Sequence, residues 1–75
     1  MSRLPRLTPR KVVAVLKRAG FVLDRVRGSH YQFYHPAKPD LVLSVPYHTR
    51  DLPTGTLHAI IKQAGMTQEE FQRLL

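Results

Sequence analysis

Two histidines are the residues of this chain best suited to acid–base chemistry. His30 follows the pair Gly28-Ser29 at the start of a predicted strand, and His48 follows the next predicted strand. Histidine titrates near neutral pH and can exchange a proton with a hydroxyl group. Histidines in such places are equally typical of an ordinary solvated surface. Residue chemistry alone therefore marks His30 and His48 as candidates for a base and an acid that act on a phosphate.

The residues before His30 are suited to holding an anion. Arg25 and Arg27 supply positive charge, and the segment Arg27-Gly28-Ser29 predicts a turn. A turn exposes backbone N–H groups, and glycine lets a bulky anion approach the backbone closely. This segment is therefore a candidate phosphate-binding turn.

Other kinds of catalytic chemistry have little support. Cysteine is absent, which excludes thiolate nucleophiles, zinc–thiolate sites and disulfides. The five carboxylates are scattered, and the four histidines lack the spacing of a zinc site. There is no glycine-rich phosphate loop and no nucleophile-elbow serine motif. We therefore expect neither a metal nor a cofactor.

The charge balance points to an acidic partner. Twelve Lys and Arg residues oppose five Asp and Glu residues, which gives a net charge of +7 at pH 7 and a pI near 10.6. Cations that neutralise phosphates release counterions, and this drives binding to nucleic acids. An acidic protein fits the same charge, so composition leaves both partners open.

The 75 residues predict a single domain over residues 1–75. Hydrophobic residues make up 43% of the chain, enough for one core and too many for a disordered chain. No apolar run approaches the ~20 residues that span a bilayer, and residues 1–5 lack the apolar segment of a signal peptide. We therefore expect a soluble, cytoplasmic protein without a membrane partner.

Caps and hydrophobic spacing give the order of the elements. Thr8 is typical of an N-cap, Pro9 is typical of the first position of a helix, and Gly20 is typical of the end of a helix. A second helix is predicted over 54–64, and Thr67 begins a short third helix through a capping box. Between the first two helices the sequence predicts strands over 21–26, 30–35 and 41–45, with turns over 27–29 and 36–40.

Three consecutive strands with short links predict an antiparallel sheet, so the fold class is α+β with the order α-β-β-β-α. Two amphipathic helices would cover one face of the sheet, and the other face would stay open. Alternation along residues 30–35 directs His30, Gln32 and Tyr34 to the open face. The start of the second strand lies near the end of the third, which brings His30 and His48 to the same end of the sheet.

Five segments follow one another along the chain: Gly20-Phe21, Gly28-Ser29-His30 with Tyr31 and Phe33, Val45-Pro46-Tyr47-His48, Leu52 to Leu57, and Ile60 to Gly65. Taken together and in this order, they resemble the HicA family, the small toxins of HicA–HicB toxin–antitoxin pairs. The resemblance covers about residues 8–73, which would be the core of the domain. Gly-Ser-His alone is a weak signal, whereas the ordered set in a short basic chain is specific.

The resemblance implies a double-stranded-RNA-binding-domain-like fold and the activity of an mRNA interferase, an endoribonuclease that cuts mRNA. It implies that His30 is catalytic, that Gly28 and Ser29 form the turn presenting it, and that a HicB-type antitoxin is the partner. Val45, Pro46 and His48 match a further family segment, which makes His48 a candidate for a supporting role.

Resemblance and residue chemistry together predict a metal-free mechanism. His30 would take the proton of the RNA 2′-OH while that oxygen attacks the adjacent phosphorus. Four cations are candidates for stabilising the charge that develops, namely Arg25, Arg27, Lys38 and Arg50. The general acid stays open between His48, a protonated cation and water.

Two other functions are compatible with the sequence. A basic chain with an open sheet face and Tyr34 would serve a non-catalytic RNA-binding module equally well. A protein-interaction subunit whose basic face docks an acidic partner is the second alternative. Cleavage that depends on His30 separates the first alternative from the ribonuclease, and steep salt dependence of RNA binding argues against the second.

Overall fold

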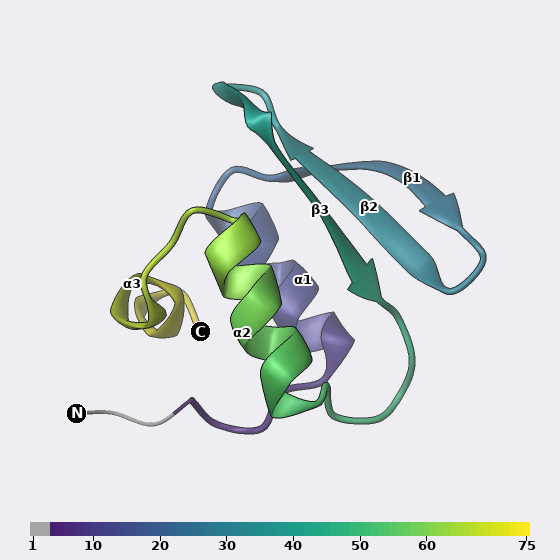
Figure 1. Cartoon of the computed structure of the whole chain (residues 1–75), viewed down its shortest axis with the longest axis vertical. Helices are drawn as coiled ribbons and strands as arrows, with labels where there is room; N and C mark the ends of the chain where they lie inside the picture. The colour runs from purple at the N-terminus through teal and green to yellow at the C-terminus, as the bar shows by residue number, and fades with distance from the viewer. Residues whose placement is uncertain (1–3) are drawn as a thin grey trace.

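The computed structural model describes residues 4–75, so the first three residues of the basic N-terminal segment lie outside it. It has the predicted α+β architecture, a three-stranded antiparallel sheet with helices (Figure 1). The two longest helices have ten residues each, too few to cross a bilayer, and no described helix meets that requirement. The elements are α1 (Pro9–Arg18), β1 (Val22–Arg27), β2 (His30–His35), β3 (Lys38–Pro46), α2 (Thr54–Gln63) and α3 (Gln68–Arg73).

Helix α1 begins as the sequence predicts, with Pro9 in its first turn and Thr8 as an extended N-cap. The Thr8 side chain makes no capping hydrogen bond. Its carbonyl instead accepts from the N–H groups of Lys11 and Val12, each at 3.1 Å. The predicted N-cap position is therefore confirmed, and Thr8 contributes its carbonyl to the first turn of the helix while its side chain caps no N–H group.

Gly20 ends α1 in a left-handed conformation, with φ +98°. Its N–H donates to the Lys17 carbonyl at 3.0 Å and the Phe21 N–H to the Leu16 carbonyl at 2.9 Å, the paired bonds of a Schellman motif. His35 packs over this turn: its Nε2 lies 3.1 Å from the Ala19 carbonyl oxygen, within hydrogen-bond distance. A Cβ on Gly20 would lie only 2.7 Å from that Nε2.

Gly20→Ala is expected to destabilise the fold by at least about 1–2 kcal/mol, the cost of a left-handed conformation for a residue with a Cβ. The clash with His35 adds to this cost. Gly55→Ala is the matched control, because Gly55 lies in α2 with open space around its missing Cβ. Alanine there should be neutral or mildly stabilising. Urea unfolding of both variants checks the difference, and equal losses of stability would contradict it.

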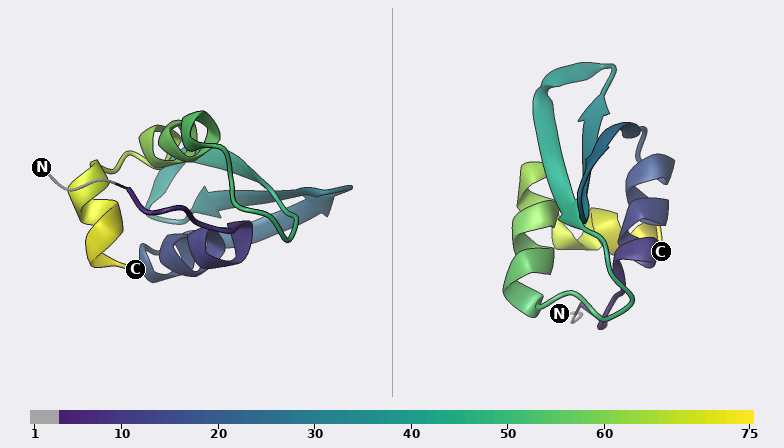
Figure 2. Two further views of the ribbon diagram at one scale, coloured as in Figure 1. Left: turned by 90° about the horizontal axis from the view of Figure 1, so that it is seen from below. Right: turned by 90° about the vertical axis from the view of Figure 1, so that its right-hand side faces the viewer.

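The sheet has the order β1-β2-β3, so β2 is the central strand and its neighbours are edge strands. Alternate residues of β2 and β3 face the helices: Phe33 lies opposite Leu43 and Tyr31 opposite Val45. Phe33 and Val45 are fully buried there. The hairpin of β1 and β2 ends in a turn that lies clear of both helices (Figures 1 and 2). The opposite face of the sheet carries the exposed Val22 and Val42, so it is open, as predicted.

Strand β1 contains a bulge that period-two alternation does not predict. Leu23 pairs with Phe33 and Arg25 with Gln32, so Asp24 is an extra residue between them. After the bulge, Arg25 and Arg27 share a face with Val22 instead of alternating away from it. The bulge thus sets which face of the sheet carries the two arginines.

The prediction of a loop over residues 36–40 is partly wrong. The turn is only Pro36-Ala37, and β3 already begins at Lys38, which pairs with His35. A register shift accommodates residues 39–41, since Tyr34 then pairs with Val42. Pro39 is tolerated because β3 is an edge strand whose outer N–H groups need no partner.

The core lies between the helices and the covered face of the sheet. Leu16 of α1, Ile60 of α2 and Phe71 of α3 are each 2% exposed or less. The N-terminal segment contributes as well: Leu7 is buried, and its carbonyl accepts from the Leu52 N–H at 2.8 Å. No polar side chain of residues 4–75 is buried, so every chemically active group lies at the surface.

Helix α3 begins with the predicted capping box. The Glu70 N–H donates to the Thr67 hydroxyl at 3.1 Å, and the Thr67 N–H donates to the Glu70 carboxylate at 2.8 Å. The hydrogen bonds from the Thr67 backbone and side chain lower the pKa of Glu70. Because the folded state lowers the pKa of Glu70, the ionised carboxylate stabilises the fold at pH values above the ordinary pKa of 4.5. This stabilisation is lost as the pH falls through the lowered pKa.

Glu70→Gln is therefore expected to destabilise the fold at neutral pH, with a difference from wild type that shrinks as the pH falls below the ordinary carboxylate range. Glu69→Gln makes the same change of charge without touching the capping box. Unfolding free energies of the three proteins measured between acidic and neutral pH check this. A difference for Glu70→Gln that stays constant over that range would contradict it.

Candidate active site

His30 is the first residue of the central strand. It lies opposite Arg27 on β1 and Pro46 on β3, on the open face of the sheet. The residue is exposed, and no group of residues 4–75 hydrogen bonds to its ring. Both ring nitrogens are therefore available to a ligand, while two flanking strands hold the backbone.

The turn before His30 is open to solvent at Gly28. Gly28 has φ +55°, which glycine adopts without strain, and no heavy atom lies within 4 Å of the position of a Cβ. The Ser29 carbonyl accepts from the Tyr47 N–H at 2.6 Å, which extends the pairing of β2 and β3 by one step. A bulky anion can therefore reach the turn at Gly28. The hydrogen bond between Ser29 and Tyr47 links the turn to the segment that carries His48.

Arg25 and Arg27 lie on the same face as His30. Arg27 is directly opposite His30, and Arg25 lies opposite Gln32, one row further along the sheet. The Arg25 Nε is 3.0 Å from the Asp24 carboxylate, an exposed pair that constrains the arginine only weakly. The two guanidinium groups therefore place positive charge beside the exposed imidazole.

His48 lies two residues beyond Pro46, the cross-strand partner of His30, so the predicted meeting of both histidines at one end of the sheet is confirmed. Its Nδ1 accepts from the Arg50 N–H at 3.1 Å. That bond leaves the proton of a neutral ring on Nε2. Tyr47 stacks on Tyr31, with ring centroids 4.1 Å apart, and this anchors the segment that carries His48.

His48 borders a hollow of about 280 Å³ between the start of α1 and the segment after β3. Arg10, in the first turn of α1, lines the same hollow. No local signal links positions 10 and 48, so only the tertiary structure reveals this cation. The other lining residues are Thr8, Tyr47 and Thr49.

Two predicted phosphate-binding residues lie apart from the arginine row. Lys38 pairs with His35 at the opposite end of the strands from His30, so the structure does not bring it to the candidate site. Arg50 is exposed and follows His48 by two residues. The candidate site is therefore the cluster of His30, Arg25, Arg27, Gly28 and Ser29. His48 and Arg50 lie outside this cluster, at the same end of the sheet.

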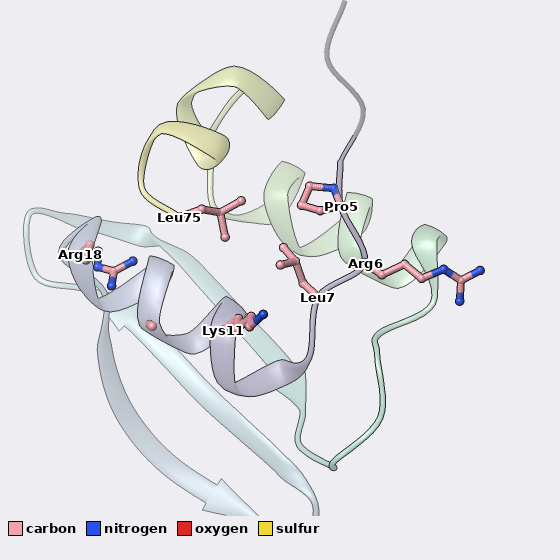
Figure 3. A pocket seen from close by; sticks show the side chains of 7 residues that line it. Pro5, Arg6, Leu7, Lys11, Arg18 and Leu75 are labelled. Atoms are coloured by element: carbon pink, nitrogen blue, oxygen red, sulfur yellow. The ribbon is translucent and has the colours of Figure 1, made fainter.

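The larger hollow, of about 420 Å³, lies elsewhere, between the N-terminal segment, α1 and the C-terminal end of the chain (Figure 3). It offers no histidine or carboxylate side chain. The Arg18 guanidinium at its wall donates to the Leu74 carbonyl at 2.6 Å and so serves to hold the C-terminal helix. The lining residues are Pro5, Arg6, Leu7, Lys11, Ala14, Arg18 and Leu75.

The arrangement around His30 suits proton transfer next to a phosphate. An exposed imidazole can act as a base, and adjacent guanidinium groups can stabilise an anion. Among residues 4–75 there is no group of three His, Cys, Asp or Glu side chains that could hold a metal ion. The chemistry that these residues themselves offer is acid–base catalysis with electrostatic support.

Comparison with known proteins identifies one family. The family model described as "HicA toxin of bacterial toxin-antitoxin" matches residues 9–66 of the 75-residue chain. The match runs from the start of α1 past the end of α2 and includes His30 and His48. A search of curated proteins gave no match.

Proposed function

Because the chain belongs to the HicA toxin family and is thus the toxin of a toxin–antitoxin system, we propose that it is an mRNA interferase with His30 as its catalytic residue. Family membership implies an antitoxin partner, and the proposal adds that this partner is of the HicB type and that both act in the cytoplasm. One observation carries the proposal: His30 is exposed on the central strand, where it pairs with Arg27 of β1 beside an open turn.

In the proposed reaction RNA supplies its own nucleophile. Neutral His30 accepts the proton of a 2′-OH, and the 2′ oxygen forms a bond to the adjacent phosphorus. The bond between phosphorus and the 5′ oxygen breaks, and the departing oxygen takes up a proton. The products are a 2′,3′-cyclic phosphate and a 5′-hydroxyl. Since the substrate brings the nucleophile, the step requires no metal-bound water.

The cations next to His30 stabilise the charge that develops on the phosphate oxygens. Arg27 lies directly opposite His30, and Arg25 follows one row away. Gly28 and Ser29 leave room for the phosphate at the turn. Lys38 is left out of this role, because its partner His35 lies at the other end of β2.

His48 is our candidate for the general acid. It lies at the same end of the sheet as His30. To act as an acid its ring must carry a proton on both nitrogens, so the bond that Nδ1 accepts from the Arg50 N–H has to open when the ring takes up its second proton. Arg50 is the nearest cation along the chain and is proposed to bind an adjacent phosphate.

A non-catalytic RNA-binding module is the second candidate, favoured by one observation. A catalytic histidine is commonly oriented by a hydrogen bond to a carboxylate or carbonyl, and no such partner holds His30 among residues 4–75. The ribonuclease is preferred because catalytic hydrogen bonds often form only when the substrate is bound.

The test is to incubate the purified protein with a structured RNA in EDTA and to map the ends of the products. Cuts that end in a cyclic phosphate support the metal-independent ribonuclease. A strict requirement for magnesium contradicts the mechanism. Binding that weakens steeply with salt, with no cleavage, supports the RNA-binding module instead.

A further inference from the structure

The open face of the sheet carries a row of apolar side chains that the proposed active site does not use. Val22, Tyr34 and Val42 pair directly across the three strands. Their exposed fractions are 40%, 39% and 60%, so each is accessible beside its neighbours. No group of residues 4–75 hydrogen bonds to the Tyr34 hydroxyl. The row is therefore a phenol ring framed by two β-branched side chains on the solvent side.

This apolar row is continuous with the candidate active site. Between it and the row of His30 lies a polar row, in which Gln32 pairs with Arg25 on one side and Ser44 on the other. The Gln32 amide and the Ser44 hydroxyl make no hydrogen bond within residues 4–75. Tyr34 follows His30 by four steps along an extended strand, a distance of about 13 Å.

From this arrangement we propose that the open face binds single-stranded RNA along β2, with one base stacked on Tyr34 between Val22 and Val42. The inference rests on the proposed function, because it assumes that the RNA runs along β2 from the phosphate that is bound at His30. Aromatic rings on an open sheet stack unpaired bases, and free amide and hydroxyl groups can bond their edges. Arg25 and Arg27 neutralise the intervening phosphates.

Single-stranded RNA fits this face better than either duplex RNA or a protein. Bases within a duplex are stacked on one another, so none is free to cover Tyr34. A stable protein interface buries about 800 Å² per partner around an apolar centre. One row of three apolar side chains beside two polar or cationic rows is smaller than such a centre and matches the size of a base.

The test measures binding without cleavage, in the full-length His30→Ala protein. The probe is a fluorescein-labelled RNA of twelve nucleotides, free or annealed to its complement. We expect the single strand to bind more tightly than the duplex. In the same protein Tyr34→Ala should weaken single-strand binding about 5- to 150-fold, the usual loss on removing one stacking ring. Tyr34→Phe should retain the affinity, since it keeps the ring.

Val26→Ala is the matched control. Val26 is 50% exposed on β1 but pairs with Tyr31, so it lies on the helix side of the same sheet. It should leave RNA binding unchanged, and thermal unfolding of every variant separates a loss of contact from a loss of fold. Equal binding by the His30→Ala protein with and without Tyr34→Ala, or tighter binding of the duplex, would overturn the proposal. The apolar row would then belong to a protein interface.

This design keeps the two proposals apart. If the wild-type protein does not cut RNA but its single-strand binding depends on Tyr34, the ribonuclease is wrong and the binding surface stands. If it cuts RNA and Tyr34→Ala changes neither the affinity nor the KM, the ribonuclease stands and the stacking site is wrong.

Discussion

Replacement of His30 by alanine is expected to lower the rate of RNA cleavage by about 10²- to 10⁴-fold, the usual contribution of a positioned acid or base. His30 is exposed and its ring makes no hydrogen bond within residues 4–75, so replacement of this side chain should not affect folding. Cleavage rates of wild-type and His30→Ala proteins on one RNA in EDTA, with thermal unfolding of both, provide the measurement.

His58→Ala is the control for this substitution. His58 is exposed on α2, away from the open face of the sheet, and its loss should leave the rate unchanged. Cleavage by His30→Ala at the wild-type rate would remove His30 from the mechanism. A similar decrease in both variants would point to a general effect of losing a histidine rather than to catalysis.

An RNA with a single 2′-deoxy nucleotide at the cleaved position is expected not to be cut at that bond. The 2′ oxygen is the nucleophile of the proposed reaction, so its absence removes the attacking atom and not merely a contact. Mapping first identifies a preferred site in an all-ribose RNA, and the same RNA with one substitution is then tested. The loss of cleavage should exceed that of His30→Ala.

A 2′-deoxy nucleotide elsewhere in the RNA should leave cleavage at the mapped site intact. This comparison separates a chemical effect from weaker binding, because both RNAs lose one hydroxyl group. Cutting at the deoxy position, with a product that carries no cyclic phosphate, would mean that water is the nucleophile. The role proposed for His30 would then have to change from activating the 2′-OH to activating water.

Much of the fold was predictable, because local rules decide it. Pro9 at the start of α1, the glycine at its end and the capping box at Thr67 are each set by residues close in the chain. The meander follows from short links between strands, and it brings His30 and His48 to the same end of the sheet. That part of the candidate site follows from topology alone.

The remaining features depend on pairing between strands, which alternation does not encode. The bulge at Asp24 brings Arg25 and Arg27 to the face of Val22. The shift after Tyr34 extends β3 to Lys38, far from the histidine it was predicted to assist. Arg10 reaches the neighbourhood of His48 only through packing of α1 against the segment after β3. Each case is decided by distant parts of the chain.

The bulge at Asp24 also affects how copies of this protein meet one another. Strands β1 and β3 both have an unpaired outer edge, and such edges can join the sheets of two molecules. The extra residue breaks the regular row of N–H and C=O groups along β1, and it is the charged Asp24, followed by the charged Arg25. On β3, Pro39 removes one donor. These features oppose edge-to-edge aggregation of the toxin, while β2, the strand that carries His30, stays enclosed between two others.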